Sequence, residues 1–262
     1  IYSRSEPPLG NESAYLHLYQ YDKRIKLSSL LISSEVETSN AEILGISQYP
    51  LTLFTSGSTG VPKGVMFSYD ATLFNLNCWK DILNLSDKTK LFVDQGCLLI
   101  LASYLYGGEV ILPENQISMT KNQSYLEIFD RYSPDTCFMM PAGYEAIAKE
   151  LVDLRGEQHV FGRVTNLLTG GAPLSDGALS IIRRYNKTPL QSGYGLTEVP
   201  LIAISDGSQS TSNKKCVGKP FDGIEVEVKS IIPNEPGNIL VSSPGQSSCY
   251  IISGNKKLIP KS

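Results

Sequence analysis

The sequence predicts an α/β protein with layered, largely parallel sheets flanked by helices and a small β-rich, barrel-like part near the C-terminus. Between residues 90 and 192, short apolar segments of strand length alternate with segments whose apolar residues recur at helical spacing. Strands that alternate with helices usually join by right-handed crossovers in a mainly parallel sheet. After Val199 the helical spacing stops, and β-branched runs between glycines and prolines predict strands only.

The elements follow from this spacing and from the turn residues between them. The predicted strands are residues 14–19, 25–32, 51–54, 64–67, 91–93, 110–112, 136–139, 164–168, 189–192, 201–204, 217–220, 224–229 and 236–241. The predicted helices are residues 69–85, 98–106, 125–131, 144–154 and 175–185. Ser68 is a candidate cap of the first helix, and Trp79 falls on its apolar stripe. Gly107 and Gly108 end the second helix, and residues 141–143 predict a turn before the fourth.

The composition indicates a soluble globular protein. Its 262 residues are 41% hydrophobic and 19% charged, which suffices for one large core or two small ones. A net charge of -3 without a long basic run argues against a nucleic-acid partner, and no apolar stretch has the length and purity of a membrane span. Five scattered cysteines without a CxxC pair predict reduced thiols in a cytoplasmic protein rather than a metal site.

The loop after the first core strand has a composition that suits phosphate. Its residues are Thr55, Ser56, Gly57, Ser58, Thr59, Gly60, Val61, Pro62 and Lys63. Glycines let the backbone approach an anion, hydroxyls donate hydrogen bonds, and an ammonium supplies charge. The spacing is not that of the common P-loop, because Pro62 precedes the lysine and a strand is expected next. We therefore predict a phosphate site in a loop between two strands, with an ordinary polar hairpin turn as the alternative.

Three segments of the chain together resemble one family. TSGSTGVPKG, from Thr55 to Gly64, resembles the phosphate loop of the adenylate-forming enzymes, which include acyl-CoA and aryl-CoA synthetases, adenylation domains of nonribosomal peptide synthetases, and luciferases. LLTGGAPLS, at residues 167–175, resembles their loop along adenine and ribose, and SGYGLTEV, at 192–199, resembles their YGxTE motif. VGKPFDGIEVEVK and PGNILVSSPG resemble the entry into their small barrel. The resemblance covers most of the chain, from Thr52 to Gly245.

The resemblance implies a role for each matching residue. The implied ATP-binding residues are Thr55, Ser56, Gly57, Ser58, Thr59, Gly60, Lys63, Gly170, Gly171, Ala172, Pro173, Tyr194, Gly195 and Thr197. Lys63, Thr197 and Glu198 would be catalytic. Tyr194 offers a ring face to adenine, Thr197 a hydroxyl to the α-phosphate, and Glu198 an oxygen ligand to Mg2+. Read alone, the Gly-Gly-Ala-Pro run is an ordinary turn, Tyr194 a core aromatic and Glu198 a carboxylate at a helix start.

The resemblance also implies a division of the chain. Residues 1–50 would be a partial N-terminal subdomain, 51–200 a core α/β nucleotide-binding subdomain, 201–250 a β-rich subdomain, and 251–262 a tail. The family's Tyr/Phe-x-Thr-Gly-Asp segment does not follow the barrel residues, and the chain stops at Ser262. We therefore expect that the family's small C-terminal domain is missing from this sequence.

The implied reaction is the ATP-dependent activation of a carboxylic acid as acyl-AMP, with release of pyrophosphate. Transfer of the acyl group to a thiol, either CoA or a phosphopantetheine carrier, would follow. An acyl or peptidyl carrier protein is thus a candidate partner beside the carboxylic-acid substrate. Chemistry of this kind needs positioning and charge neutralisation more than proton transfer, so no nucleophilic side chain is required.

The candidate acid pocket comprises Asp94, Met140, Pro141, Tyr144 and Gly193. Asp94 has the spacing of the aspartate that pairs with the substrate ammonium in amino-acid-activating adenylation domains, although a turn residue at a strand end is the alternative reading. Two other functions therefore stay open. One is an amino-acid-activating domain of a peptide synthetase, and the other is a truncated module that binds nucleotide without catalysis.

Overall fold

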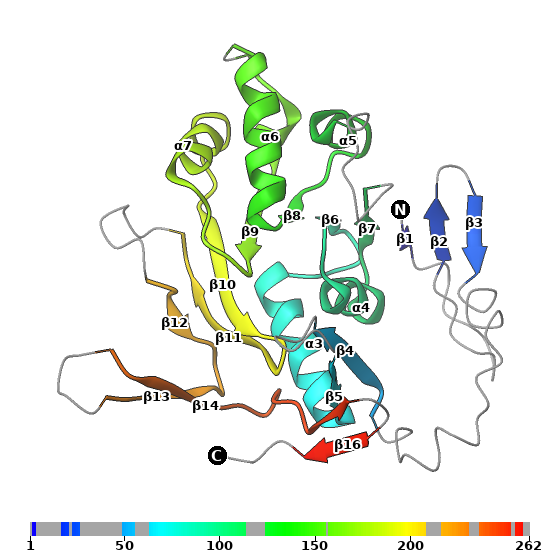
Figure 1. Ribbon diagram of the computed structural model, residues 1–262. Helices are drawn as coiled ribbons and strands as arrows, with labels where there is room; N and C mark the ends of the chain where they lie inside the picture. Colours follow the sequence, from blue (N-terminus) through cyan, green and yellow to red (C-terminus); the bar gives the residue numbers. More distant parts are fainter. Residues whose placement is uncertain are drawn as a thin grey trace. The chain divides into compact units, whose positions relative to one another are not determined.

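The computed structural model describes residues 2–3, 17–20, 23–26, 49–55, 63–113, 124–155, 157–207, 216–230, 236–252 and 255–258 (Figure 1). Within these residues the chain forms two compact units that alternate along the sequence. Unit 1 draws on Ile1–Glu35, Trp79–Ser192 and Asp206–Ser212, and unit 2 on Val36–Cys78, Gly193–Ser205 and Asn213–Ser262. The two units do not coincide with the four consecutive parts expected above, and that fourfold division stays a prediction.

Unit 1 contains the parallel sheet that the sequence predicts. Its parallel strands are β6 (Lys90–Val93), β7 (Glu109–Ile111), β8 (Thr136–Phe138) and β9 (Asn166–Gly170), in the order β9-β8-β6-β7. The antiparallel strands β1 (Tyr2–Ser3), β2 (His17–Gln20) and β3 (Lys23–Lys26) continue the sheet beyond β7. β10 (Leu190–Leu196) follows β9 and runs on into unit 2. The predicted mainly parallel α/β architecture is confirmed.

Helices lie between successive strands along the chain, as the apolar spacing predicts. They are α3 (Tyr69–Leu83), α4 (Cys97–Tyr106), α5 (Tyr125–Tyr132), α6 (Pro141–Asp153) and α7 (Asp176–Tyr185), with a short 3-10 helix, η2 (Val160–Arg163), which the sequence did not predict. Serine caps begin three of them, since Ser68, Ser124 and Ser175 accept hydrogen bonds from backbone N–H groups in the following turn. α5, α6 and α7 lie side by side in Figure 1.

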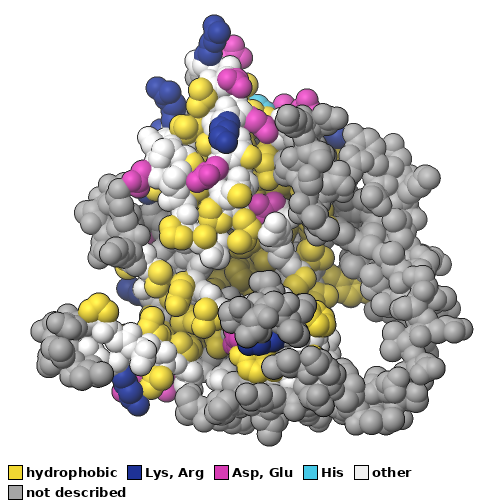
Figure 2. All heavy atoms as spheres, viewed as in Figure 1, with side chains coloured by type: hydrophobic (Ala, Val, Ile, Leu, Met, Phe, Trp, Pro, Cys, Tyr) yellow, Lys and Arg dark blue, Asp and Glu magenta, His cyan; other side chains and the backbone are white. Residues whose placement is uncertain are grey.

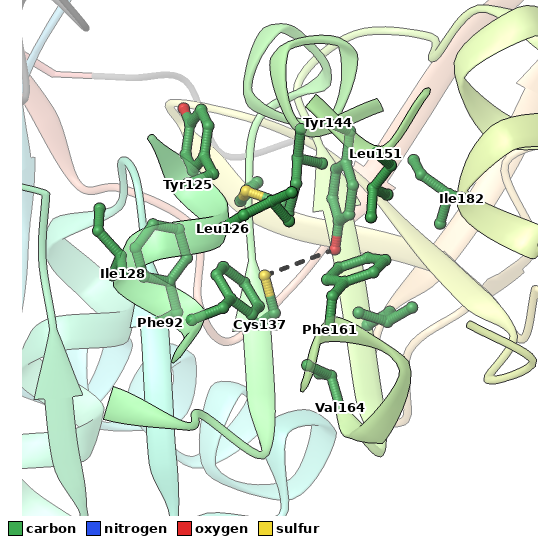
Figure 3. Close-up of a cluster of buried hydrophobic side chains, with 14 of the residues drawn as sticks. Phe92, Tyr125, Leu126, Ile128, Cys137, Tyr144, Leu151, Phe161, Val164 and Ile182 are labelled. Carbon is green, nitrogen blue, oxygen red and sulfur yellow. Dashed lines mark hydrogen bonds between the residues drawn. The ribbon is translucent and has the colours of Figure 1, made fainter. Parts of the chain in front are cut away.

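The core of unit 1 lies between these helices and the sheet (Figure 3). Three fully buried rings form its centre, because Phe129 packs against Phe92 at 5.1 Å and against Phe161 at 5.5 Å between ring centroids. Trp79 makes an edge contact with Phe138 at 5.8 Å, as its place on the apolar stripe predicts. Aromatic pairs in such tilted or edge arrangements add to the burial of apolar surface in holding a core together.

Helix α6 begins earlier than the sequence predicts. Residues 141–143 were expected to form a turn, but they are the first turn of the helix. Proline is tolerated at the first helical position, because the N–H that it lacks would have no partner within the helix. Met140 precedes the helix in an extended conformation, and its backbone N–H donates to the Asp94 carboxylate instead of to a local cap. Pro141 was thus a local signal for this helix start, and the contact of Asp94 with Met140, which is distant in sequence, fixes the residue before it.

Unit 2 contains an antiparallel sheet in the order β16-β15-β5-β4. Its strands are β4 (Leu51–Thr55), β5 (Lys63–Phe67), β15 (Cys249–Ile252) and β16 (Asn255–Leu258). β4 and β5 form the predicted pair of strands around the polar loop, with Thr55 opposite Lys63. β16 and part of β15 lie within the residues of the expected tail, and β15 pairs with both β16 and β5.

The remaining strands of unit 2 are antiparallel. β10 continues beside β11 (Val199–Ser205), and β11 pairs on its other edge with β12 (Lys219–Pro220). β13 (Glu225–Lys229) and β14 (Asn238–Ser242) form a separate two-stranded sheet. Val228 and Ile239 on that sheet are more than half exposed. These strands confirm a β-rich C-terminal part, but a closed barrel stays a prediction. Among the helices that the structure describes, none has the length and apolar character needed to cross a membrane.

Candidate functional site

In unit 2, the predicted phosphate loop is bounded by two paired strand ends. Thr55 ends β4, and Lys63 begins β5 with a partly exposed side chain. Ser56, Gly57, Ser58, Thr59 and Gly60 lie outside the described residues. A side chain at Gly64 would force its neighbours to shift, since a Cβ would lie 2.5 Å from the Ile251 side chain and 3.1 Å from that of Thr52. The loop therefore starts and ends at fixed positions on a tightly packed sheet.

The YGxTE segment forms a β-hairpin, and Thr197 and Glu198 occupy the turn between β10 and β11. The alternative reading of Glu198 as a carboxylate at a helix start is thus wrong. Tyr194 is partly buried and packs against a small apolar cluster of Val199, Ile202 and Ala203. Gly195 faces the opposite strand so closely that a Cβ would collide with the Pro200 carbonyl. The hairpin therefore fixes the backbone of the motif, while Thr197 and Glu198 remain partly exposed.

Two contacts hold Glu198 in place. Its Oε1 accepts a hydrogen bond of 2.6 Å from the Tyr250 hydroxyl, and its backbone carbonyl accepts one of 2.9 Å from the Ser247 N–H. Burial and then the Glu198 carboxylate raise the pKa of Tyr250 to about 12, so the phenol keeps its proton and acts as the donor. No sequence signal predicted Tyr250, because the bond joins residues far apart in the chain.

The carboxylate oxygens of Glu198 can bind Mg2+ only together with oxygen atoms of a bound phosphate and of water. In the part of the chain that the structure describes, no three side chains from histidine, cysteine, aspartate and glutamate gather as a metal site. Mg2+ in nucleotide sites is usually held by one or two carboxylates together with substrate phosphates and water. A single, partly exposed carboxylate oriented by a hydroxyl donor suits this mode of binding.

In unit 1, the glycine pair after β9 adopts a tight turn. Gly170 ends the strand as a buried residue, while Gly171, Ala172 and Pro173 are exposed. Gly171 has a φ of 80°, a left-handed conformation that favours glycine, and a Cβ there would lie 2.6 Å from the Met140 side chain. The structure thus places one predicted nucleotide residue, Gly171, against one predicted pocket residue, Met140.

Asp94 lies buried at the end of β6, with 7% of its surface exposed. Both carboxylate oxygens lie 3.0 Å from the Met140 N–H, and the carboxylate also fills the space where a side chain on Gly143 would stand. Asp94 therefore joins the end of β6 to the start of α6. This contact with Met140 gives the Asp94 carboxylate a structural role that does not depend on a substrate.

The pKa of Asp94 predicts a pH-dependent change in stability. Burial raises this pKa from 3.8 to about 6, although hydrogen bonds from backbone N–H groups partly oppose the shift. The folded protein thus holds this proton more tightly than the unfolded chain, and ionised Asp94 lowers the free energy of unfolding as the pH rises through this range. We expect Asp94→Asn, which keeps an acceptor for Met140, to stabilise the protein by about 2 kcal/mol at pH 7.5.

Urea denaturation at pH 3.8 and pH 7.5 would check this prediction. The gain from Asp94→Asn should be small at the lower pH and full at the higher one. A matched change, Asp153→Asn at the exposed end of α6, removes a carboxylate that Met140 does not contact and should change the free energy of unfolding by less than about 1 kcal/mol at either pH. An Asp94→Asn effect of the same size at both pH values would contradict the assignment.

The other two pocket candidates in unit 1 are buried. Tyr144 has no exposed surface. Its hydroxyl donates to the Leu168 carbonyl at 3.0 Å and also lies in contact with the Cys137 sulfur, at 3.8 Å (Figure 3). Pro141 is buried at the start of α6. Both residues pack in the interior of unit 1, and neither offers a free polar group to a ligand. Gly193, the fifth candidate, lies in β10 and belongs to unit 2.

Comparison with known proteins places the chain in a family. The family described as AMP-binding enzyme matches residues 19–251, which is most of the chain. The chain belongs to the AMP-binding enzyme family. Proteins that resemble it include luciferin 4-monooxygenase of Nipponoluciola cruciata, with 24% identity over 78% of this chain and 39% of the relative. Feruloyl-CoA synthase of an Amycolatopsis species is 27% identical over 79% of this chain and 43% of the relative.

A solved structure shows the same fold. The amide bond synthetase McbA from Marinactinospora thermotolerans superimposes with a TM-score of 0.63 and 24% identity, covering 78% of this chain and 42% of that protein. This AMP-binding family chain therefore spans less than half the length of these three proteins. The fold resemblance and the family membership agree with the three motifs found in the sequence.

Proposed function

We propose that this protein activates a carboxylic acid with ATP, forming an acyl-AMP and releasing pyrophosphate. The observation that carries the proposal is the partly exposed Glu198 carboxylate, held on the hairpin turn of the YGxTE segment in a chain of the AMP-binding family. The proposed transfer of the acyl group to CoA or to a carrier-bound phosphopantetheine thiol rests on the family resemblance. Feruloyl-CoA synthase, one of the relatives, acts with CoA according to its name.

The chain's own residues have separate proposed roles. Lys63 and the hydroxyls of the loop before it bind the phosphates that leave, and Thr197 donates to the α-phosphate. Tyr194 and the segment of Gly170–Pro173 bind adenine and ribose. Glu198 holds Mg2+, which supplies charge neutralisation for the phosphates when bound. In-line displacement at phosphorus depends on such positioning and charge, and not on a nucleophilic side chain.

The experiment that tests this function is acid-dependent exchange of labelled pyrophosphate into ATP. The purified protein is incubated with ATP, Mg2+ and panels of aryl, fatty and amino acids. Exchange that requires one of these acids supports the proposal. Binding of ATP by calorimetry without exchange for any acid would instead support a nucleotide-binding module without catalysis.

A second candidate, activation of an amine-bearing acid, is favoured by Asp94. With a pKa of about 6, this carboxyl is mostly ionised at neutral pH and could pair with an ammonium group. Its two hydrogen-bond contacts with Met140 argue the other way, because they already engage both oxygens. If Asp94 selects the acid, Asp94→Ala will abolish exchange with amino acids and leave exchange with amine-free acids intact. Equal loss with both classes would indicate that Asp94 only supports the fold.

A further inference from the structure

One short segment, residues 247–250, holds Glu198 by both its backbone and its side chain. The Ser247 N–H donates to the Glu198 carbonyl at 2.9 Å, and the Tyr250 hydroxyl donates to Oε1 at 2.6 Å. Both Tyr250 and Glu198 are partly exposed. The Tyr250 hydroxyl engages Oε1 of Glu198 alone, and among the described residues no group donates to Oε2.

The same segment is fixed to the strand that begins at Lys63. In the pairing of β15 with β5, Tyr250 lies opposite Val65, and the Ser248 N–H donates to the Met66 carbonyl at 2.8 Å. Residues opposite one another share a sheet face, and so do residues two apart along a strand. One face of the sheet therefore carries Tyr250, Val65 and Lys63. Lys63 is the diagonal neighbour of Tyr250, and the Cα atoms of such neighbours are typically about 7–8 Å apart.

We propose that Tyr250 is a positioning residue that orients the Glu198 carboxylate toward Mg2+ and fixes the distance between this carboxylate and Lys63. This inference rests on the proposed function, because it assigns a task to a residue that acts through Glu198. Hydrogen bonds to a ligating carboxylate fix its rotation and keep one oxygen available, and their loss typically weakens metal binding 10- to 100-fold. β15 thus couples the two charged groups of unit 2 that the proposed function assigns to the phosphates.

The test measures ATP binding by calorimetry with excess EDTA and with saturating Mg2+. The ratio of the two dissociation constants is the gain in affinity that Mg2+ provides. In Tyr250→Phe we expect this gain to fall about 10-fold, while binding in EDTA stays unchanged. Tyr69→Phe is the matched control, since Tyr69 is 67% exposed in unit 2 and its loss of a hydroxyl should leave the gain unchanged.

A double mutant separates positioning from a general structural role. Glu198→Gln should remove most of the Mg2+ gain, and adding Tyr250→Phe to that variant should change nothing further. An undiminished gain in Tyr250→Phe, a weaker binding of equal size in EDTA, or an additional loss in the double mutant would overturn the inference. Wild-type protein that binds no ATP under either condition would overturn the proposed function itself. Wild-type protein that binds ATP without a Mg2+ gain would overturn the role of Glu198, and with it that of Tyr250.

Discussion

Glu198→Gln is expected to lower acid-dependent pyrophosphate exchange by about 100-fold or more. Glutamine has the same shape and can still accept the Tyr250 hydrogen bond through its amide oxygen. It lacks the negative charge that a hard dication requires, so the phosphates would lose charge neutralisation as pyrophosphate departs. Loss of one preorganised electrostatic contact to the reacting centre typically costs 100- to 1,000-fold in rate.

The matched control for this substitution is Glu225→Gln. Glu225 is exposed on β13 in the same unit, so its change removes the same charge from the surface without touching the turn of Thr197 and Glu198. We expect wild-type exchange in the control. Exchange by Glu198→Gln at the rate of the control would refute the metal assignment, and the thermal midpoint of both variants should remain that of the wild type.

Gly195→Ala is expected to destabilise unit 2 by about 3 kcal/mol, because overpacking against rigid neighbours is expensive. A Cβ at this position would collide with the carbonyl oxygen of Pro200, and the Val199 oxygen would lie only 3.0 Å away. These neighbours belong to the backbone of the opposite strand of the hairpin, so they cannot move aside as a flexible side chain would. Urea denaturation would measure the loss as a lower midpoint.

Gly177→Ala provides the contrasting case. Gly177 lies near the start of α7, and a Cβ there would meet nothing within 4 Å. Alanine is a better helix former than glycine, so we expect a gain of about 0.5–1 kcal/mol. If Gly195→Ala did not lower the free energy of unfolding, the hairpin geometry of the motif would be wrong. Close packing of the two hairpin strands is therefore a sufficient reason for a glycine at position 195 of the motif.

Local sequence patterns predicted much of the fold. Helix α3 begins after the predicted cap at Ser68, and the alternation of strand and helix spacing predicted the parallel sheet. Each of these signals lies within a few residues of the element it specifies. The polar loop between β4 and β5 was predicted for the same reason, since its glycines, proline and lysine occur together.

Contacts between residues distant in sequence could not be predicted in this way. Asp94 holds Met140, the residue before α6, and Tyr250 holds the carboxylate of Glu198. Residues beyond 250 read as a tail because nothing near them indicates that β15 pairs with β5. The resemblance gave Glu198 its implied role, but only the folded chain shows what holds the carboxylate in position.

The measurement that tests the central claim most directly follows the oxygen atoms of the acid. An accepted carboxylic acid labelled with 18O in its carboxylate is incubated with the protein, ATP, Mg2+ and hydroxylamine, which captures the activated acyl group as a hydroxamate. If the carboxylate attacks the α-phosphorus, its bridging oxygen leaves with AMP. Mass spectrometry should then find one 18O atom in AMP and none in pyrophosphate. Label in inorganic phosphate with formation of ADP, or unlabelled AMP, would contradict activation through an acyl-AMP.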